Sequence, residues 1–243
     1  MELYGLVGKT LMHSFSRNFF ENLFSSKNIM AEYRNFELQE IDQIKDVFAL
    51  DPSGLNVTIP YKESVIPFLD ELSGEARDIG AVNVIQFLEG KKIGHNTDAF
   101  GFQQSIKPFL TNKHERAMII GTGGASKAVA YVFKSIGIDV IFISRNPSGE
   151  KEFPYGAINE HMVNACKVVV NCTPVGTFPE VDESVLFPYQ HLTSDHLVVD
   201  LIYNPAKTKF LELSEEYGAT ILNGESMLKE QALKAWSIWQ EGK

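Results

Sequence analysis

A glycine-rich turn between an apolar strand and a helix constrains the fold of this chain more than any other segment. Residues 117–120, Ala-Met-Ile-Ile, are typical of a buried strand, and Gly-Thr-Gly-Gly-Ala-Ser follows at 121–126 before a helix-forming run. In this setting Gly121 allows a tight turn, and Gly123 lets the backbone approach a pyrophosphate at the amino end of the helix. The pattern predicts a Rossmann-type dinucleotide-binding unit.

Strand-like and helix-like segments alternate in both halves of the chain, which is typical of α/β proteins. Strands are expected at 3–7, 33–38, 54–59 and 81–87, with helices at 17–28 and 41–50. A helix at 99–110 leads into a second series, with strands at 117–120, 139–143, 168–171 and 197–201 and helices at 125–136 and 207–217. We therefore expect a mostly parallel α/β substrate domain at 1–100 and a Rossmann-type domain at 101–224.

The final predicted helix, at 225–240, has an apolar face that must be buried against another element. This face carries Leu228, Ala232, Ala235, Trp236 and Trp239. We expect residues 225–243 to pack back onto the first domain.

Composition excludes several classes of partner. The 22 basic and 31 acidic residues give a net charge of −9, which disfavours nucleic acid and anionic membranes as partners. Cys166 and Cys172 flank one predicted strand and lie roughly 20 Å apart, which is too far for a disulfide. The amino end lacks the features of a signal peptide, and no stretch is apolar over a membrane-spanning length. We expect a cytoplasmic protein without a metal site.

The end of the second Rossmann strand distinguishes NAD from NADP. A carboxylate at this position would bind the ribose 2′-hydroxyl of NAD, but the chain has Ser144-Arg145-Asn146. Arg145 can hold a 2′-phosphate with its planar guanidinium group, and Lys151 is a weaker candidate for the same role. The alternative is an ordinary surface arginine in a turn. The residues favour NADP.

Polar side chains of the first half lie where predicted strands give way to loops. Taken singly, Lys62 fits an exposed surface lysine, and Asp98 fits a helix N-cap. Asn83 lies inside a predicted strand, where a buried amide needs specific partners. Because open α/β sheets bind ligands at strand ends, Lys62 and Asp98 form a candidate pair for moving a proton during hydride transfer.

Six motifs in order resemble the shikimate dehydrogenase family along the whole chain, at 13–16, 56–62, 96–101, 171–176, 200–205 and 224–232. The resemblance implies reversible, NADPH-dependent reduction of 3-dehydroshikimate to shikimate, with Lys62 and Asp98 as catalytic residues. The substrate contacts that it implies are Ser14, Ser16, Thr58, Asn83, Tyr203 and Gln231. The cofactor contacts that it implies are Gly121, Thr122, Gly123, Gly124, Ala125, Ser144, Arg145, Thr173, Gly224 and Met227.

These implied roles are chemically coherent. A lysine ammonium group, protonated at neutral pH, can donate to the carbonyl oxygen that gains charge as hydride arrives. Asp98 would hold and orient that lysine and a substrate hydroxyl.

Two alternative functions fit the same residues. The chain departs from the family pattern at Arg17, Val84, Ser144 and Thr177, so a quinate/shikimate dehydrogenase with a shifted substrate or cofactor preference is one alternative. A catalytically silent nucleotide-sensing module is another, and the presence of Lys62 and Asp98 disfavours it. The expected assembly is a monomer or homodimer.

Overall fold

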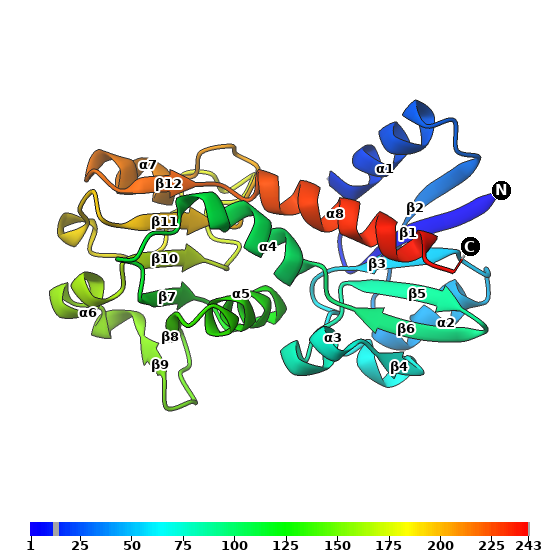
Figure 1. Ribbon diagram of the computed structural model, residues 1–243, viewed down its shortest axis with the longest axis horizontal. Coiled ribbons are helices and arrows are strands. Elements are labelled where there is room, and N and C mark those ends of the chain that lie inside the picture. Colours follow the sequence, from blue (N-terminus) through cyan, green and yellow to red (C-terminus); the bar gives the residue numbers. More distant parts are fainter. Residues whose placement is uncertain (12–14, 243) are drawn as a thin grey trace. The chain divides into compact units, whose positions relative to one another are not determined.

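A computed structural model describes residues 1–11 and 15–242 of the chain. It contains two compact units, each built around a six-stranded sheet (Figure 1). Unit 1 comprises Met1–Phe100 and Gln231–Lys243, and unit 2 comprises Gly101–Glu230. The predicted α/β fold class is confirmed.

Unit 1 holds a mixed but mostly parallel sheet of order β2-β1-β3-β5-β6-β4. Its strands are β1 (Glu2–Gly8), β2 (Ala31–Glu37), β3 (Gly54–Val57), β4 (Glu71–Leu72), β5 (Val84–Leu88) and β6 (Lys91–His95). Its helices are α1 (Phe15–Ser26), α2 (Ile44–Phe48) and α3 (Gly74–Ile79), and α4 (Asp98–Ile106) begins in this unit. Only β5 runs antiparallel to both of its neighbours, β3 and β6.

Side-chain alternation along the strands of unit 1 produces an apolar layer on each face of the sheet. Tyr4 of β1 packs with Phe20 of α1 and with Trp239 of α8 (Glu225–Gln240). Val7, the residue of opposite parity on β1, packs instead with Ile44 of α2. The last part of α8 thus completes the core of unit 1, which confirms that the final helix packs back onto the first domain.

Gly54 lies against the buried Trp239 indole, and this contact gives a prediction about stability. A Cβ at residue 54 would lie 2.5 Å from two indole atoms, and the indole is held in place by a hydrogen bond from Nε1 to the Ile85 carbonyl. We expect Gly54→Ala to lower the free energy of unfolding by about 1–3 kcal/mol through overpacking. Urea denaturation followed by circular dichroism measures this change.

Gly74→Ala is the matched control, because a Cβ there meets nothing within 4 Å. It should leave stability unchanged or raise it slightly, since alanine restricts the unfolded chain. Equal stability of the Gly54→Ala variant and the parent would contradict the predicted overpacking.

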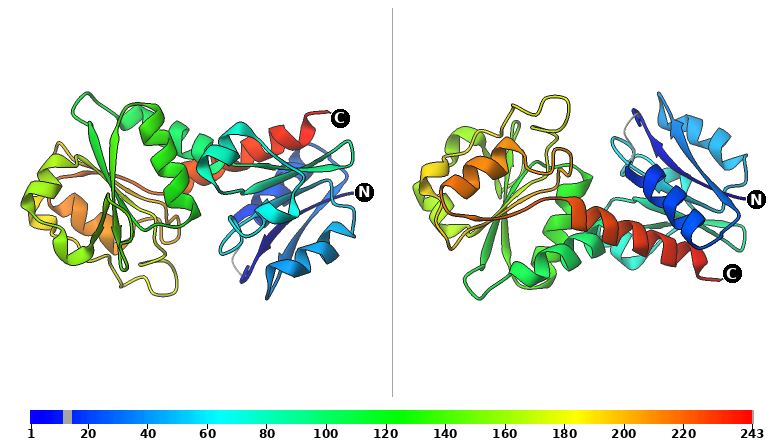
Figure 2. Two further views of the ribbon diagram at one scale, coloured as in Figure 1. Left: turned by 90° about the horizontal axis from the view of Figure 1, so that it is seen from below. Right: turned by 90° about the horizontal axis from the view of Figure 1, so that it is seen from above.

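Unit 2 contains a fully parallel sheet of order β12-β11-β10-β7-β8-β9. Its strands are β7 (Arg116–Ile120), β8 (Asp139–Ser144), β9 (Glu152–Pro154), β10 (Val168–Asn171), β11 (Leu197–Asp200) and β12 (Thr220–Leu222). Helices α5 (Gly124–Ser135) and α7 (Lys209–Glu216) cover opposite faces, and α6 (Glu160–Ala165) precedes β10 (Figure 2). This strand order is that of the dinucleotide-binding fold, and its switch point lies between β7 and β10.

The observed elements differ from the predicted ones where segments are short or polar. The predicted helix at 41–50 is a 3-10 turn at Ile41–Gln43 followed by α2. The predicted helix at 99–110 stops at Ile106, before a 3-10 turn at Lys107–Phe109. The predicted strand at 81–87 begins later, at Val84. The apolar pattern does not predict β4, β6, β9, β12, α3 or α6, because each has too few residues or too little alternation.

Within residues 1–11 and 15–242, no helix combines the length and the apolar character needed to cross a membrane.

Candidate functional site

The antiparallel strand β5 brings the polar groups of unit 1 to one edge of the sheet. Lys62 lies beyond the carboxyl end of β3, and Asp98 lies beyond the carboxyl end of β6, which runs parallel to β3. Asn83 immediately precedes β5, so reversal of this strand places the amide at the same edge. The sequence assignment of Asn83 to a strand interior was wrong in position, because pairing with β3 and β6 starts one residue later.

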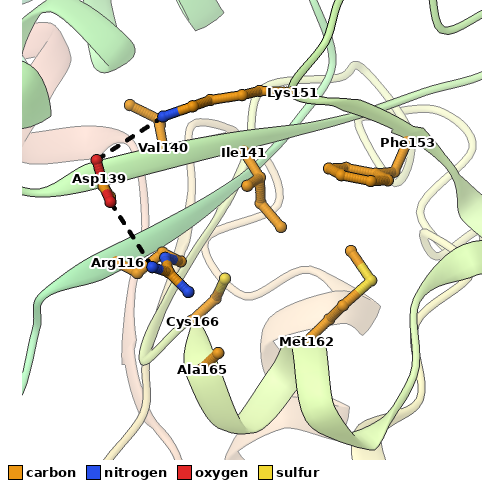
Figure 3. Close-up of a pocket in the computed structure, with 9 residues that line it drawn as sticks. All are labelled: Arg116, Asp139, Val140, Ile141, Lys151, Phe153, Met162, Ala165 and Cys166. Carbon is orange, nitrogen blue, oxygen red and sulfur yellow. Dashed lines mark ion pairs between the residues drawn. The ribbon is translucent and has the colours of Figure 1, made fainter.

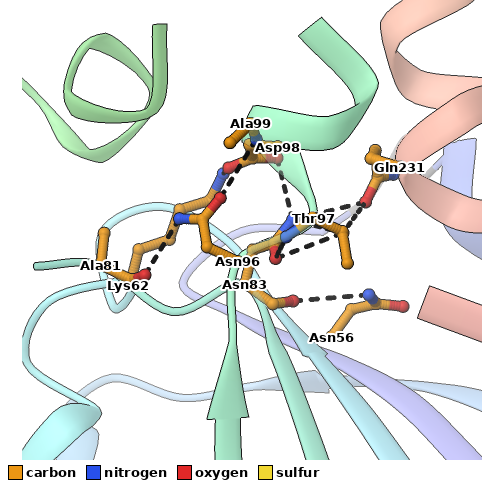
Figure 4. Close-up of polar contacts among 9 residues, drawn as sticks. All are labelled: Asn56, Lys62, Ala81, Asn83, Asn96, Thr97, Asp98, Ala99 and Gln231. Atoms are coloured by element: carbon orange, nitrogen blue, oxygen red, sulfur yellow. Dashed lines mark hydrogen bonds and ion pairs between the residues drawn. The ribbon is translucent and has the colours of Figure 1, made fainter. Parts of the chain in front are cut away.

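Lys62 and Asp98 form a largely buried ion pair (Figure 4). The distance from Lys62 Nζ to Asp98 Oδ2 is 2.6 Å, and the two side chains are 15% and 8% exposed. Two other lysines of unit 1 that form ion pairs have far more exposed side chains, Lys45 at 68% and Lys91 at 57%. The surface-lysine interpretation of Lys62 is therefore not supported by its surroundings.

Asn83 fixes the orientation of Asp98 from the other side. The Thr97 backbone N–H donates to Asn83 Oδ1 at 2.7 Å, and because an N–H can only donate, the amide orientation is set. Asn83 Nδ2 then donates to Asp98 Oδ1 at 2.9 Å and to Thr97 Oγ1 at 3.0 Å. Both oxygens of the Asp98 carboxylate are thus bound by side chains, one by an amide and one by an ammonium group.

Helix capping does not account for Asp98, because Asn96 provides the capping oxygen. Asn96 Oδ1 accepts from the Ala99 backbone N–H at 3.3 Å, and Asn96 Nδ2 donates to the Ala81 carbonyl at 2.9 Å. The cap holds the first turn of α4 in place. Asp98 remains available to bind Lys62 and a ligand.

The nucleotide turn of unit 2 has the geometry that dinucleotide binding requires. Gly121 has φ +107°, a conformation that side-chain-bearing residues rarely adopt, and its N–H donates to the Ile143 carbonyl at 2.8 Å. A Cβ at Gly123 would meet nothing within 4 Å, so the space in front of this backbone is open. Helix α5 begins at the next residue and has no acidic residue in its first turn. An anion is therefore favoured at this end of α5.

The other predicted cofactor residues of unit 2 lie at the carboxyl ends of its strands or at α8. Thr173 follows β10 at the switch point, where its Cγ2 would be 3.2 Å from a Cβ at Gly121. Ser144 ends β8 and accepts from the Asn146 N–H at 3.2 Å, which shapes the turn that carries the exposed Arg145. Gly224 approaches the Leu201 carbonyl so closely that any side chain would clash, and Met227 is buried in α8.

Comparison with known proteins shows relatives over nearly the whole chain. Residues 6–85 match the family model described as the shikimate dehydrogenase substrate binding domain. The shikimate dehydrogenase (NADP(+)) of Pyrococcus abyssi is 38% identical over 247 residues, covering 98% of this chain and 92% of the relative. The chain belongs to the shikimate dehydrogenase family.

Solved structures of family members are also similar. Shikimate 5-dehydrogenase of Thermus thermophilus, in complex with NADP(H) and shikimate, has a TM-score of 0.86 at 28% identity, covering 99% of this chain and 94% of that one. Quinate dehydrogenase of Corynebacterium glutamicum, in complex with NAD, has a TM-score of 0.87 at 28% identity, covering 98% and 93%.

Of the substrate contacts expected in this family, Asn83 and Gln231 lie together with the Lys62–Asp98 pair. Gln231 Oε1 lies 3.4 Å from Thr97 Oγ1 and 3.5 Å from Asn83 Nδ2. Thr58 follows β3 at the same sheet edge, and Ser16 lies in the first turn of α1. Ser14 lies outside the described residues, and Tyr203 follows β11 in unit 2.

Tyr33 is a part of the unit 1 network that the sequence did not reveal. Its hydroxyl donates to Asn56 Oδ1 at 2.7 Å, and Asn56 Nδ2 donates to the Asn83 carbonyl at 3.4 Å. Burial raises the pKa of Tyr33 well above its ordinary value of 10, while a hydrogen bond with Ser16 opposes part of the rise. The phenol therefore stays a donor. An isolated tyrosine in a strand gives no sequence signal for this role.

A pocket in unit 2 lies away from the nucleotide turn, at the amino ends of β7 and β8 (Figure 3). At its mouth Asp139 pairs with Arg116 at 3.7 Å and with Lys151 at 3.8 Å. This pairing directs Lys151 toward the amino end of β8, so the structure favours Arg145 over Lys151 for a cofactor phosphate. In the part of the chain that the structure describes, no cluster of three or more His, Cys, Asp or Glu side chains could hold a metal ion.

Proposed function

We propose that the chain catalyses reversible, NADP-linked reduction of 3-dehydroshikimate to shikimate, a step in aromatic amino-acid biosynthesis, with Lys62 as the proton donor. The observation that carries this proposal is the buried Lys62–Asp98 pair, with its Nζ–Oδ2 distance of 2.6 Å. A lysine held by a carboxylate beside polar groups suited to a polyhydroxylated ring matches the chemistry of carbonyl reduction. Family membership supplies the substrate and cofactor class.

Unit 1 provides the groups for proton transfer. Lys62 donates a proton to the substrate carbonyl oxygen as that oxygen gains negative charge, and it accepts the proton back when shikimate is oxidised. Asp98 holds the ammonium group in place and accepts from a ring hydroxyl. Asn83 and Gln231 sit beside Asp98 and offer further hydrogen bonds to ring hydroxyls.

The carboxylate end of the substrate is assigned to other groups of the predicted set. Ser14, Ser16 and Tyr203 are proposed to bind it, and Thr58 is proposed near the ring. Their hydroxyls can donate to a carboxylate or accept from a ring hydroxyl.

Unit 2 is proposed to hold the dinucleotide, which supplies the hydride when bound. The backbone of Gly121, Thr122, Gly123, Gly124 and Ala125, which is open at Gly123, suits the pyrophosphate at the amino end of α5. Ser144 and Arg145 suit the 2′-phosphate, since an exposed guanidinium group follows β8 and no carboxylate does. Thr173, Gly224 and Met227 complete the proposed set.

The alternative is a quinate/shikimate dehydrogenase with a shifted substrate or cofactor preference. The similarity of this fold to that of a quinate dehydrogenase solved with NAD supports this alternative. Arg145 favours the NADP-linked form instead, because NAD carries no 2′-phosphate for this guanidinium group to bind.

Steady-state kinetics with shikimate and quinate, each with NADP and NAD, tests the proposal. We expect the highest kcat/KM with shikimate and NADP. Arg145→Ala should raise KM for NADP by about ten- to a hundredfold, because it removes a charge-assisted hydrogen bond, and should leave KM for NAD unchanged. Lys151→Ala is the matched control and should leave both values unchanged.

Preference for NAD in the parent protein, or an unaltered KM for NADP after Arg145→Ala, would contradict the cofactor assignment. A higher kcat/KM with quinate than with shikimate would favour the alternative.

We further propose a cytoplasmic location and a monomeric or homodimeric assembly. Cys166 and Cys172 are both free thiols, which suits a reducing compartment. Light scattering of the purified protein distinguishes the two assemblies.

A further inference from the structure

A buried polar chain in unit 2 links β11 and β10 to the loop at the switch point. Asp200 ends β11 beside Asn171, which ends β10, and both side chains are fully buried. Asn171 Nδ2 donates to Asp200 Oδ1 at 3.1 Å, and Thr173 donates to Asn171 Oδ1 from its N–H at 3.0 Å and from its hydroxyl at 2.7 Å. This series of hydrogen bonds therefore ends at Thr173, which lies beside the Gly121 turn.

The direction of each hydrogen bond in this chain is set by backbone donors. The Thr173 N–H can only donate, so Asn171 must present Oδ1 to Thr173 and Nδ2 to Asp200. The Ile202 N–H donates to the same Asp200 oxygen at 3.1 Å. Asp200 Oδ1 must accordingly act as a double acceptor.

The second Asp200 oxygen is also occupied. Thr208 Oγ1 accepts from the Leu211 N–H at 3.3 Å at the start of α7, and its own hydrogen goes to Asp200 Oδ2 at 2.6 Å. Burial raises the pKa of Asp200 to about 6, so at pH 7.5 it remains an ionised acceptor for all three donors.

These bonds leave the Thr173 hydroxyl with acceptor capacity only. Its hydrogen is committed to Asn171, and the Val175 N–H approaches one of its two lone pairs at 3.4 Å. A free threonine hydroxyl could either donate or accept a hydrogen bond. The buried hydrogen bonds therefore restrict Thr173 to ligand groups that donate. The remaining lone pair suits an N–H or O–H donor of a ligand.

We propose that Asn171 and Asp200 are positioning residues that hold Thr173 as a hydrogen-bond acceptor for a donor group of the bound dinucleotide. The proposal rests on the proposed function, since it assumes that NADP binds at the Gly121 turn. Asn171 and Asp200 are fully buried and act only through Thr173. The two residues are absent from the set of predicted cofactor contacts.

Titration of NADPH fluorescence against the purified full-length protein tests this proposal. We expect Asn171→Ala and Thr173→Val each to raise Kd for NADPH by about tenfold, the value of one well-placed hydrogen bond. The double variant should bind like Thr173→Val alone, because Asn171 acts through that hydroxyl. KM for shikimate should change less than about twofold in all three, because Lys62, Asp98, Asn83 and Gln231 belong to unit 1 and the substituted residues to unit 2.

Three Asp200-linked variants separate positioning from stability. Thr208→Val removes a buried bond to Asp200 and the α7 cap, so it should lower the melting temperature while leaving Kd for NADPH unchanged. Asp200→Ala removes the acceptor that orients the Asn171 amide, so it should weaken NADPH binding, whereas Asp200→Asn can keep an oxygen facing Asn171 and should restore most of the lost affinity.

The proposal is overturned if Asn171→Ala binds NADPH like the parent, if Thr208→Val weakens binding equally, or if Asn171 and Thr173 effects add. Should Asn171→Ala fail to fold, the loss of affinity in Asp200→Ala and its recovery in Asp200→Asn decide the matter through the same titration. A parent protein that does not bind NADPH would refute the proposed function instead.

Discussion

Replacing Lys62 with alanine should lower kcat for shikimate oxidation by about 10²–10⁴-fold, the usual contribution of a positioned general acid or base. No other amine is described in contact with Asp98. No neighbouring group of the described network can therefore replace Lys62 as proton donor. NADPH binding should be unaffected, because Lys62 belongs to unit 1 and the proposed nucleotide residues belong to unit 2. Steady-state kinetics together with NADPH titration measures both effects.

Lys91→Ala is the matched control for loss of a lysine ion pair. Lys91 pairs with Glu71 at the same 2.6 Å distance, but its side chain is exposed. Its loss should change stability by less than about 1 kcal/mol and leave kcat unchanged. A folded Lys62→Ala variant that turned over shikimate at the parental rate would show that Lys62 is not catalytic.

Asp98→Asn should reduce kcat/KM by about 10²–10³-fold, within the range expected for a group that orients an acid–base residue. The new side chain can keep an oxygen toward Asn83, which leaves an NH₂ group facing the Lys62 ammonium where a carboxylate stood. Two donors then oppose each other, and Lys62 leaves its position. Kinetics over a range of shikimate concentrations separates the loss in kcat from the rise in KM.

Asp70→Asn serves as the control, because Asp70 pairs with Lys92 at 2.7 Å near the surface. That variant should retain parental kinetics. In the double variant Lys62→Ala/Asp98→Asn we expect losses far smaller than the product of the single effects, since the two residues act as a unit. Fully multiplicative losses would mean that Asp98 acts independently of Lys62.

Local sequence was sufficient to predict the long elements of both units. The apolar run at 117–120 and the glycine turn after it identified β7 and the start of α5. The Trp-bearing face at 225–240 identified α8 with its observed bounds. These segments could be predicted because their hydrophobic period is regular over enough residues to distinguish strand from helix.

Short and polar elements could not be predicted in the same way. Strand β6, Lys-Lys-Ile-Gly-His, has one strongly apolar residue and is held by pairing with β5 and β4 rather than by its own pattern. Strand β6 nevertheless determines the position of Asp98, because it ends at His95, shortly before that residue. The energy of pairing between strands distant in the sequence cannot be predicted from a local residue pattern.

The sequence by itself indicated the reaction class and the cofactor type, and it singled out Lys62 and Asp98 as candidate catalytic residues, because these depend on residue chemistry and motif order. Only the tertiary structure showed what surrounds these two side chains. In the structure Asn96 caps α4, and the Lys62–Asp98 pair is largely buried. Asn83 and Tyr33 belong to one hydrogen-bond network because β5 runs antiparallel to its neighbours. The physical reason is that burial and hydrogen-bond direction arise from groups distant in the sequence, which meet only when the sheet is assembled.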